Sequence, residues 1–428
     1  MPGSLGRRLV SNSGWNFAGH GVGLAAAVVA IPVLIRNLGP ETFGIFSIYL
    51  ALVGYFGLLD LGIGRAVTTE VASHDTRNDS TGLVGSVATA VAMLGAIGTV
   101  GAGLIVLFRE QILGLLLSNS PSMGEDGQSS LTVLAITIPL VLLTSGLRGA
   151  LEGLRQFKVV SQITMPIGAL MFAAPAFMSV SSPRLTSLMW VVFAVRLAGL
   201  ALYLHTCRRR IVGFDLRHGN LRQTRTLLRA GGWMTVSNVV SPLMTSLDRV
   251  VVGAQVSMAA VAHYVTAYEM ATRVTAVASS IGSAAFPEFV RQAADKTPND
   301  VRRRQFLRAS ALACLVGLIP ALMIFLFARE ILSVWISPAF ATESHLILRI
   351  LLVGVVINGA TSIPFAFIQG IGRADMTAKF HLLELVLYLP TLLTLLSIFG
   401  VLGAAMAWVA RVALDAALMF TYSLRTLR

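Results

Sequence analysis

Apolar segments of about twenty residues recur along the whole sequence, and they limit the possible folds more than any other feature. A helix rises about 1.5 Å per residue, so each segment can cross a hydrocarbon core of about 30 Å. Charged residues make up 12% of the chain, whereas soluble domains contain about 25%. The segments also lack the short polar–apolar alternation of membrane β-barrels. The sequence therefore predicts an all-α polytopic membrane protein.

Positive charge predicts the orientation of these helices. With a cytoplasmic N-terminus, twenty-three Lys and Arg residues lie on the cytoplasmic side and four on the other side. Because cytoplasmic loops are enriched in Lys and Arg, this split predicts that both termini are cytoplasmic. The net charge of +13 is then explained by these loops, and no nucleic-acid partner is expected. Twelve transmembrane helices are predicted, at approximately 13–35, 45–67, 83–107, 129–148, 158–178, 185–206, 232–255, 258–285, 306–327, 344–369, 379–398 and 401–422.

An internal repeat divides the chain. The Gly-Trp pair at 14–15 recurs at 232–233, and Arg155 recurs as Arg373, in both cases 218 positions later. A shared offset indicates a duplicated six-helix unit in one orientation, which is typical of transporters with a substrate site between two bundles. The predicted parts are an N-terminal six-helix lobe at 1–206, a basic amphipathic cytoplasmic linker at 207–231 and a C-terminal six-helix lobe at 232–428.

Catalytic and metal-binding signatures are not found. The sequence has no phosphate-binding P-loop, its seven histidines show no paired-ligand spacing, and its two cysteines form no metal motif. A lipid-modifying membrane enzyme would need a polar loop with convergent carboxylates. The largest predicted outer loop, Glu110 to Ser130, offers Glu125 and Asp126 alone. We therefore predict no enzyme activity, no catalytic residue, no metal and no cofactor.

Charged residues inside the predicted spans are the candidates for function. Each costs roughly 2.5–3.5 kcal/mol near a helix centre and normally faces a bundle interior or a wet cavity. Arginine suits an anionic ligand because its guanidinium group grips phosphate with two hydrogen bonds. Six arginines and five acids lie within the spans, so their numbers are only weak evidence for an anionic rather than a cationic substrate. The residues are Asp60, Arg65, Arg196, Asp248, Arg249, Glu269, Arg273, Arg349, Glu384, Arg411 and Asp415.

Spacing suggests how some of these charges are satisfied. Glu269 and Arg273, like Arg411 and Asp415, are four residues apart, so each pair can form an ion pair on one helix face. Asp248 and Arg249 are adjacent and point about 100° apart on a helix, so at least one should contact another helix. Arg196 and Arg349 are both expected to form hydrogen bonds to other helices, and Arg65 lies close enough to the cytoplasmic margin to reach the surface.

Three stretches resemble a known family. "NLGPETFGIFSIYLALVGYFGLLDLGIGRAV", "SLDRVVVGAQVSMAAVAHYVTAYEMATRV" and "FIQGIGRADMTAK" are similar to polysaccharide flippases of the O-antigen (Wzx) type. These belong to the multidrug/oligosaccharidyl-lipid/polysaccharide exporter superfamily. The resemblance implies a MATE-like fold with twelve helices in two lobes, alternating access, and transport of an undecaprenyl-diphosphate-linked oligosaccharide to the outer leaflet of the bacterial plasma (inner) membrane. Membrane lipids and polysaccharide polymerase or ligase proteins are the other implied partners.

The candidate site residues fall into two groups. Arg65, Arg249 and Arg273 are candidates for binding the diphosphate or glycan. Asp60, Asp248 and Glu269 are candidates for binding a coupling H⁺ or Na⁺ or for pairing helices. The alternative function is a cation-coupled multidrug or metabolite exporter of the same superfamily, which would line its cavity with carboxylates that lack arginine partners.

Overall fold

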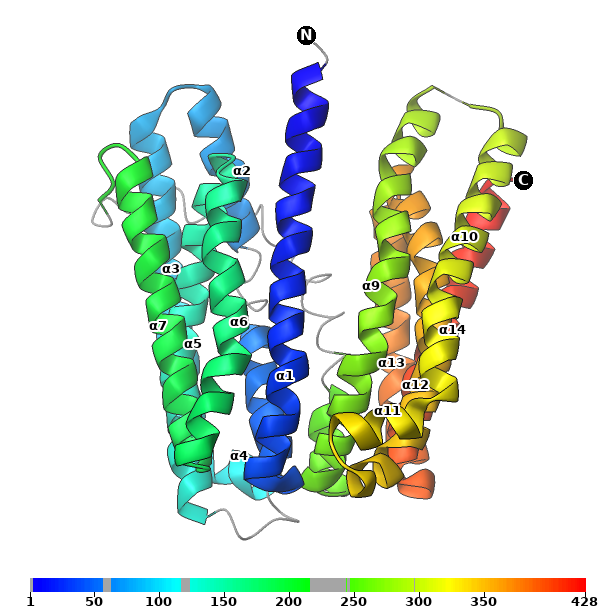
Figure 1. The fold of residues 1–428 in the computed structure, drawn as a ribbon. Coiled ribbons are helices and arrows are strands. Elements are labelled where there is room, and N and C mark those ends of the chain that lie inside the picture. The colour runs from blue at the N-terminus through cyan, green and yellow to red at the C-terminus, as the bar shows by residue number, and fades with distance from the viewer. Residues whose placement is uncertain (1–2, 57–62, 117–123, 216–243, 245–246, 296) are drawn as a thin grey trace. The chain divides into compact units, whose positions relative to one another are not determined.

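The computed structural model describes residues 3–56, 63–116, 124–215, 244, 247–295 and 297–428 (Figure 1). Every regular element in these ranges is a helix, which confirms the all-α prediction. The helices belong to two compact units, Met1–Pro242 and Leu243–Arg428.

The first unit is organised around α5. This helix contacts α2, α3 and α7 over much of its length, and α1 packs mainly on α6. Apolar side chains of α2, α3, α5, α6 and α7 form one buried core that includes Val67, Val87 and Leu151. The helices are α1 (Gly3–Phe56), α2 (Ile63–Thr76), α3 (Ser80–Leu107), α4 (Arg109–Leu116), α5 (Gly124–Gly153), α6 (Phe157–Ser181) and α7 (Leu185–Arg210).

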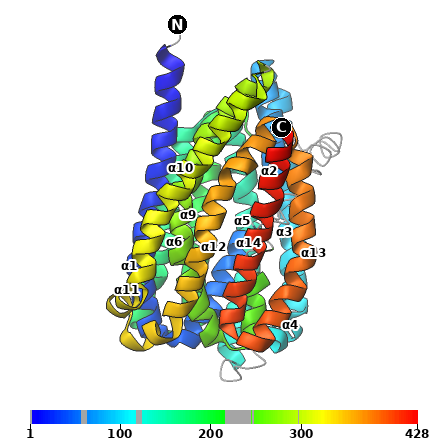
Figure 2. The ribbon, with the colours of Figure 1, turned by 90° about the vertical axis from the view of Figure 1, so that its right-hand side faces the viewer.

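The second unit is organised around α12, which contacts α9, α10, α11 and α14, while α13 packs on α14 (Figure 2). A short helix at 247–255 precedes α9. The other helices are α9 (Met258–Ala294), α10 (Asn299–Leu326), α11 (Ala328–Trp335), α12 (Pro338–Gly370), α13 (Ala374–Phe399) and α14 (Val401–Thr426).

The same order of helix lengths occurs in both units. Helices α3 to α7 contain 28, 8, 30, 25 and 26 residues, and α10 to α14 contain 28, 8, 33, 26 and 26. This agreement supports the duplication inferred from sequence. The eight-residue helices α4 and α11 were not predicted, because two turns are too short to show a helical period in a run that is already apolar.

The offset of 218 also aligns an interruption of the helix in the two units. Gly39 has φ 75° and ψ 163° and separates two helical segments within α1. Glycine tolerates this positive φ, and Pro40 can begin the next segment because its missing N–H needs no partner there. The aligned residue Ser257 is extended and caps α9, since its hydroxyl accepts a hydrogen bond from the Ala260 N–H. The structure therefore breaks the helix between the predicted spans 13–35 and 45–67, and a second break lies at Ser257, where the repeat places it.

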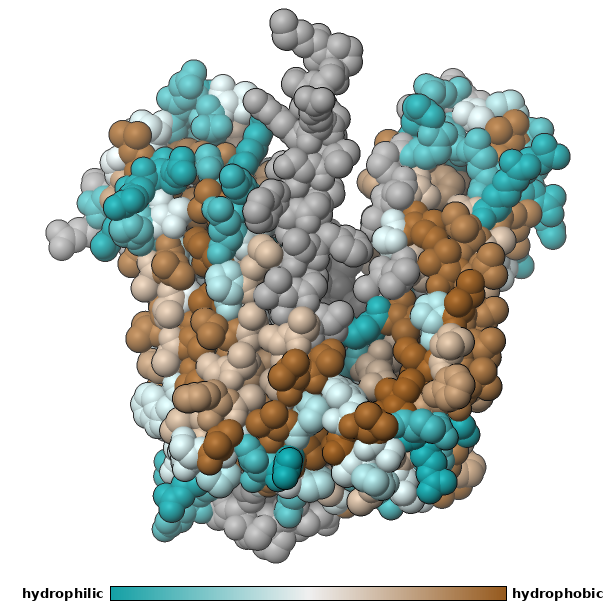
Figure 3. Space-filling model, viewed as in Figure 1, coloured by the Kyte–Doolittle hydropathy of each residue, from teal (hydrophilic) through white to brown (hydrophobic). Residues whose placement is uncertain are grey.

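Nine helices within the described residues are long and apolar enough to cross a membrane. Eight of them correspond to the third to sixth predicted spans (83–107 to 185–206) and to the ninth to twelfth (306–327 to 401–422). The ninth, Ala25–Gly54, lies within α1. On the visible face of each unit, hydrophobic residues cover the middle and hydrophilic residues gather at the ends (Figure 3). The protein is therefore a multi-pass membrane protein. The predicted span at 232–255 and the linker at 207–231 lie mostly outside the described residues.

Glycine allows α2 and α5 to approach closely. A Cβ atom added to Gly149 would lie 2.3 Å from the Gly64 carbonyl oxygen. The Thr68 hydroxyl donates hydrogen bonds of 3.1 Å to both Gly64 and Gly149 carbonyls. The absence of a side chain at Gly149 therefore allows α5 to pack closely against the α2 backbone at Gly64.

We expect Gly149→Ala to destabilise the first unit, because its new methyl group would meet backbone atoms that cannot move independently. Overpacking of this kind costs roughly 1–3 kcal/mol. Gly101→Ala is the matched control, since an added Cβ there has no neighbour within 4 Å and alanine favours a helix. Thermal unfolding of the two purified variants measures the difference, and equal midpoints would contradict the close approach.

Candidate functional site

A buried carboxylate joins the helix at 247–255 to α9. Asp248 is 0% exposed. It accepts a hydrogen bond of 2.5 Å from the Tyr264 hydroxyl and one of 2.8 Å from the Arg249 backbone N–H. A buried carboxylate needs such donors because it has lost its hydration. The interhelix partner expected for this Asp-Arg pair is therefore present.

Arg249 and Arg273 meet at a single carboxylate. Glu269 accepts a hydrogen bond of 3.1 Å from Arg249 through Oε1 and one of 2.8 Å from Arg273 through Oε2. The contact with Arg273 is the predicted ion pair within α9, and the contact with Arg249 links two helices. With Asp248 counted, this group contains two carboxylates and two guanidinium groups, so an anionic ligand would have to displace Glu269 to bind both arginines.

The two arginines differ in exposure and support. The Arg249 side chain is 11% exposed and the Arg273 side chain is 43% exposed. The Arg249 guanidinium lies 5.3 Å from the centre of the Tyr268 ring, a cation–π distance. Tyr268 in turn stacks on Tyr264 and meets Trp408 edge-on. Arg249 is therefore supported by the Tyr268 ring, whereas the more exposed Arg273 is held by its ion pair with Glu269.

A second group of charges lies between α13 and α14. The Arg411 guanidinium is 3.6 Å from Glu384. One ligand atom each from His381, Glu384 and Asp415 lie within 4.8 Å of one another. The predicted ion pair between Arg411 and Asp415 within α14 is wrong. Packing of α13 on α14 brings Glu384 to Arg411, and this contact cannot be seen in the spacing of either helix.

Several buried polar atoms of this second group make no hydrogen bond to other described residues. The Glu384 side chain is 1% exposed, and no donor reaches either of its oxygens. Buried polar atoms are normally satisfied by protein or water, so these atoms could be satisfied by water or, for the carboxylates, by a cation. The other atoms are Asp415 Oδ1, Arg411 Nε, Tyr388 Oη and Trp408 Nε1.

The residues predicted from sequence are partly brought together. Asp248, Arg249, Glu269 and Arg273 form one connected group in the second unit. Asp60 lies outside the described residues. Arg65 lies on α2 in the first unit, but its side chain is outside what the structure describes.

Other side chains near the site were not assigned to it from sequence. Glu384, Arg411 and Asp415 were recognised as charges in the membrane without being placed in a common cluster. The spacing of His381 and Glu384, one turn apart on α13, was the available signal. Tyr264 and Tyr268, four residues apart on α9, similarly mark an aromatic face.

Arg349 has the structural role predicted for it, whereas the buried Nε of Arg196 has no hydrogen-bond partner among the described residues. The Arg349 Nε donates a hydrogen bond of 3.0 Å to the Phe325 carbonyl, and its guanidinium lies 5.4 Å from the Phe325 ring. Phe325 is in the last turn of α10, where unpaired carbonyls and the helix dipole favour a cation. Arg349 therefore caps one helix from another.

Comparison with known proteins agrees with this architecture. A solved inward-facing structure of a multidrug resistance MATE family transporter of the MOP superfamily matches with a TM-score of 0.80 at 15% identity, covering 94% of each chain. The inward closed structure of the lipid II flippase MurJ matches with a TM-score of 0.77 at 13% identity, covering 97% of this chain and 87% of that one. These matches define the fold as MATE-like.

Sequence relatives define the family more narrowly. The model of the polysaccharide biosynthesis protein family matches residues 9–293, and the MatE model matches residues 234–394. A Shigella flexneri protein named "Putative O-antigen transporter" is 31% identical over 413 residues, which is 96% of each chain. The chain belongs to the polysaccharide biosynthesis protein family, within the MOP superfamily, and the family resemblance seen in the sequence is confirmed.

Proposed function

We propose that this protein moves a polyprenyl-diphosphate-linked oligosaccharide from the inner to the outer leaflet of the bacterial plasma membrane by alternating access. The observation that carries the proposal is the convergence of Arg249 and Arg273 on Glu269. A diphosphate offers several anionic oxygens in fork geometry. It can displace the carboxylate and take both guanidinium groups.

The carrier lipid and its orientation follow from this role. Undecaprenyl diphosphate is the proposed anchor of the glycan, with its chain remaining in the lipid. The charge split in the sequence supports cytoplasmic termini and therefore loading from the cytoplasmic side. The basic segment at 207–231 would lie on the anionic cytoplasmic leaflet, and polymerase or ligase proteins would receive the exported glycan.

Coupling to H⁺ or Na⁺ is proposed at the cluster between α13 and α14. Glu384 and Asp415 lie close together while Arg411 supplies one opposing charge. Two ionised carboxylates then leave one negative charge that a proton or Na⁺ can neutralise. His381 completes the set of possible ligands.

The alternative is a cation-coupled multidrug or metabolite exporter. The same carboxylate cluster and the MatE match over 234–394 favour it. The arrangement of Arg249 and Arg273 favours an anionic substrate instead, because a cationic drug would meet two guanidinium groups beside Glu269.

Deletion of the gene tests the proposal in cells. We expect lipid-linked oligosaccharide units to accumulate on the cytoplasmic side and surface polysaccharide to be lost, with both restored by the wild-type chain. Normal surface polysaccharide in the deletion strain would contradict the proposed substrate. A change in drug resistance alone would favour the exporter.

A further inference from the structure

Buried aromatic side chains connect the two groups of charges in the second unit. Trp408, three residues before Arg411 on α14, meets the Tyr268 ring edge-on, and Tyr268 lies beside the Arg249 guanidinium. The Tyr388 ring of α13 lies 5.7 Å from the Arg411 guanidinium. All three rings are buried, so the charges on either side of them interact in a region from which most water is excluded.

Arg411 is held by a contact that can be exchanged. Its guanidinium lies 3.6 Å from Glu384, which is an ion-pair distance but too long for a hydrogen bond. The buried Nε of Arg411 makes no hydrogen bond to the described residues, so this side chain keeps a donor for another acceptor. The titratable side chains around it are Asp248, Tyr268, His381, Glu384, Tyr388 and Asp415.

Asp248 is the other acceptor within reach of the Arg411 charge. That charge acts on Asp248 as well as on Glu384. Asp248 accepts two hydrogen bonds, one from Tyr264 and one from the Arg249 N–H, whereas a carboxylate can accept about four. Because Asp248 is fully buried, a further donor from Arg411 would stabilise it.

The position of Arg411 sets the net charge beside the proposed substrate site. Asp248 and Glu269 balance Arg249 and Arg273, so this group is neutral while Arg411 pairs with Glu384. With Arg411 on Asp248, the group contains three guanidinium groups and two carboxylates. Buried charges interact strongly at short distances, so the added positive charge favours an anionic ligand at Arg249.

A cation at the second group supplies the reason for Arg411 to turn. His381, Glu384 and Asp415 each offer a ligand atom within 4.8 Å of the others. A proton or metal cation that binds there competes with Arg411 for Glu384 and also engages Asp415. Because a buried charge without a partner is unfavourable, Arg411 then pairs with the remaining carboxylate, Asp248.

We propose that Arg411 couples ion binding to substrate binding by moving between Glu384 and Asp248. This inference rests on the flippase function proposed above. Without a bound cation, Arg411 pairs with Glu384 and the substrate site is neutral. With a cation bound, Arg411 pairs with Asp248, and Arg249 and Arg273 hold a diphosphate more tightly. Arg411 is thus a positioning residue, and by linkage the bound diphosphate raises the affinity for the cation by the same factor.

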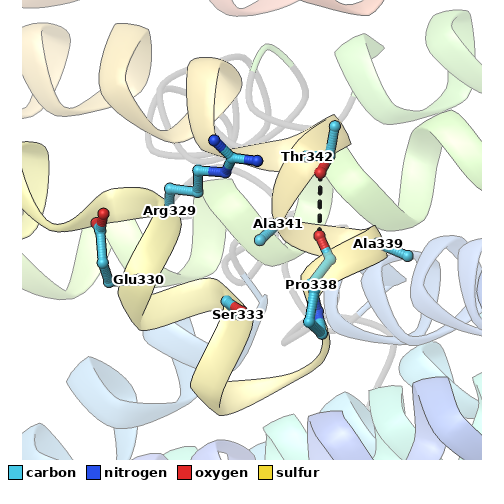
Figure 4. Close-up of a pocket in the computed structure, with 7 residues that line it drawn as sticks. All are labelled: Arg329, Glu330, Ser333, Pro338, Ala339, Ala341 and Thr342. Carbon is cyan, nitrogen blue, oxygen red and sulfur yellow. Dashed lines mark hydrogen bonds between the residues drawn. The ribbon is translucent and has the colours of Figure 1, made fainter.

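A mutant cycle in the purified full-length protein tests this assignment. Inorganic diphosphate is the probe, and calorimetry measures its affinity at one pH and one salt concentration. Glu384→Gln combined with Asp415→Asn imitates carboxylates neutralised by a cation, and this neutral pair is compared in chains with Arg411, Arg411→Lys and Arg411→Gln. Arg329→Gln is the matched control, because this exposed arginine lines a separate pocket between α11 and α12 (Figure 4).

We expect the neutral pair to raise the affinity for diphosphate about tenfold, within the range typical of coupled sites. Arg411→Lys should keep this increase because it keeps the charge, and so should Arg329→Gln. In Arg411→Gln the neutral pair should change the affinity by about twofold or less, as for independent positions. An equal increase with and without Arg411 would overturn the inference, since the carboxylates would then act directly on the substrate site.

The wild-type protein provides a second measurement that needs no substitution in the carboxylates. Diphosphate affinity should rise with proton or sodium concentration in the wild type and in Arg329→Gln, and the rise should be lost in Arg411→Gln. Thermal unfolding establishes that each variant is folded. An ion dependence that persists in folded Arg411→Gln would overturn the role of Arg411 and leave the substrate site intact. A wild type that binds no diphosphate under any of these conditions would contradict the proposed substrate site together with this inference.

Discussion

Arg249→Gln is expected to reduce export of lipid-linked oligosaccharide roughly 10–100-fold, because a charged hydrogen bond contributes about 1.5–3 kcal/mol to binding. The variant leaves Arg273, which is paired with Glu269, as the single guanidinium group of this pair for a diphosphate. The aromatic support from Tyr268 remains in place, and Asp248 keeps its bond from Tyr264. The measurement is surface polysaccharide in a deletion strain that expresses the variant at wild-type abundance.

Two further variants show whether the charge or the fork of Arg249 matters. Arg249→Lys keeps the charge and loses bidentate geometry, so an intermediate defect is expected. Arg303→Gln removes an exposed cation from α10, where no role in binding is assigned, and should behave as wild type. Wild-type export by Arg249→Gln would show that this residue does not bind the substrate.

Glu384→Gln is expected to abolish the effect of an ion gradient on transport. Coupling between two sites typically amounts to about 1–3 kcal/mol, which corresponds to roughly 5–150-fold in affinity. The variant removes one of two buried carboxylates and leaves Arg411 opposite Asp415 alone. No uncompensated negative charge then remains to bind H⁺ or Na⁺. Transport into proteoliposomes, with and without an imposed proton or sodium gradient, measures the change.

The exposed acid Glu343 on α12 provides the control for this experiment. Glu343→Gln should respond to the gradient as wild type does, while Glu384→Gln should transport at the same low rate with or without it. A gradient response that survives in Glu384→Gln would place the coupling site elsewhere in the protein. A response to sodium but not to protons in the wild type would identify the ion.

Much of the fold was predictable because membrane helices depend on features local to the sequence. Apolar runs mark helices α3, α5, α6 and α7 and their repeats, and the offset of 218 aligns Gly39 with Ser257. Helix α9 was harder to delimit. It continues to Ala294 past charged residues such as Glu288 and Arg291. The apolar pattern ends before these residues, although the helix extends beyond the membrane.

Contacts in the site were predictable where two charged residues lie on one face of a helix, or where adjacent residues must point in different directions. The Glu269–Arg273 pair follows from a spacing of four residues, and the divergent Asp248 and Arg249 follow from 100° per residue. The contact of Arg411 with Glu384 depends on how α13 packs against α14. No residue spacing within either helix encodes how the two helices pack. The short helix α11, which lines a pocket, was likewise not visible in the sequence pattern.

Purified protein in proteoliposomes offers the most direct test of the proposed flippase activity. A polyprenyl-diphosphate oligosaccharide is placed in both leaflets, and an impermeant sugar-oxidising reagent or lectin reports how much becomes accessible from outside. We predict that the wild type makes the inner pool accessible, that Arg249→Gln does so much more slowly, and that protein-free vesicles do not. Equal accessibility in protein-free and wild-type vesicles under an applied gradient would contradict the proposed function.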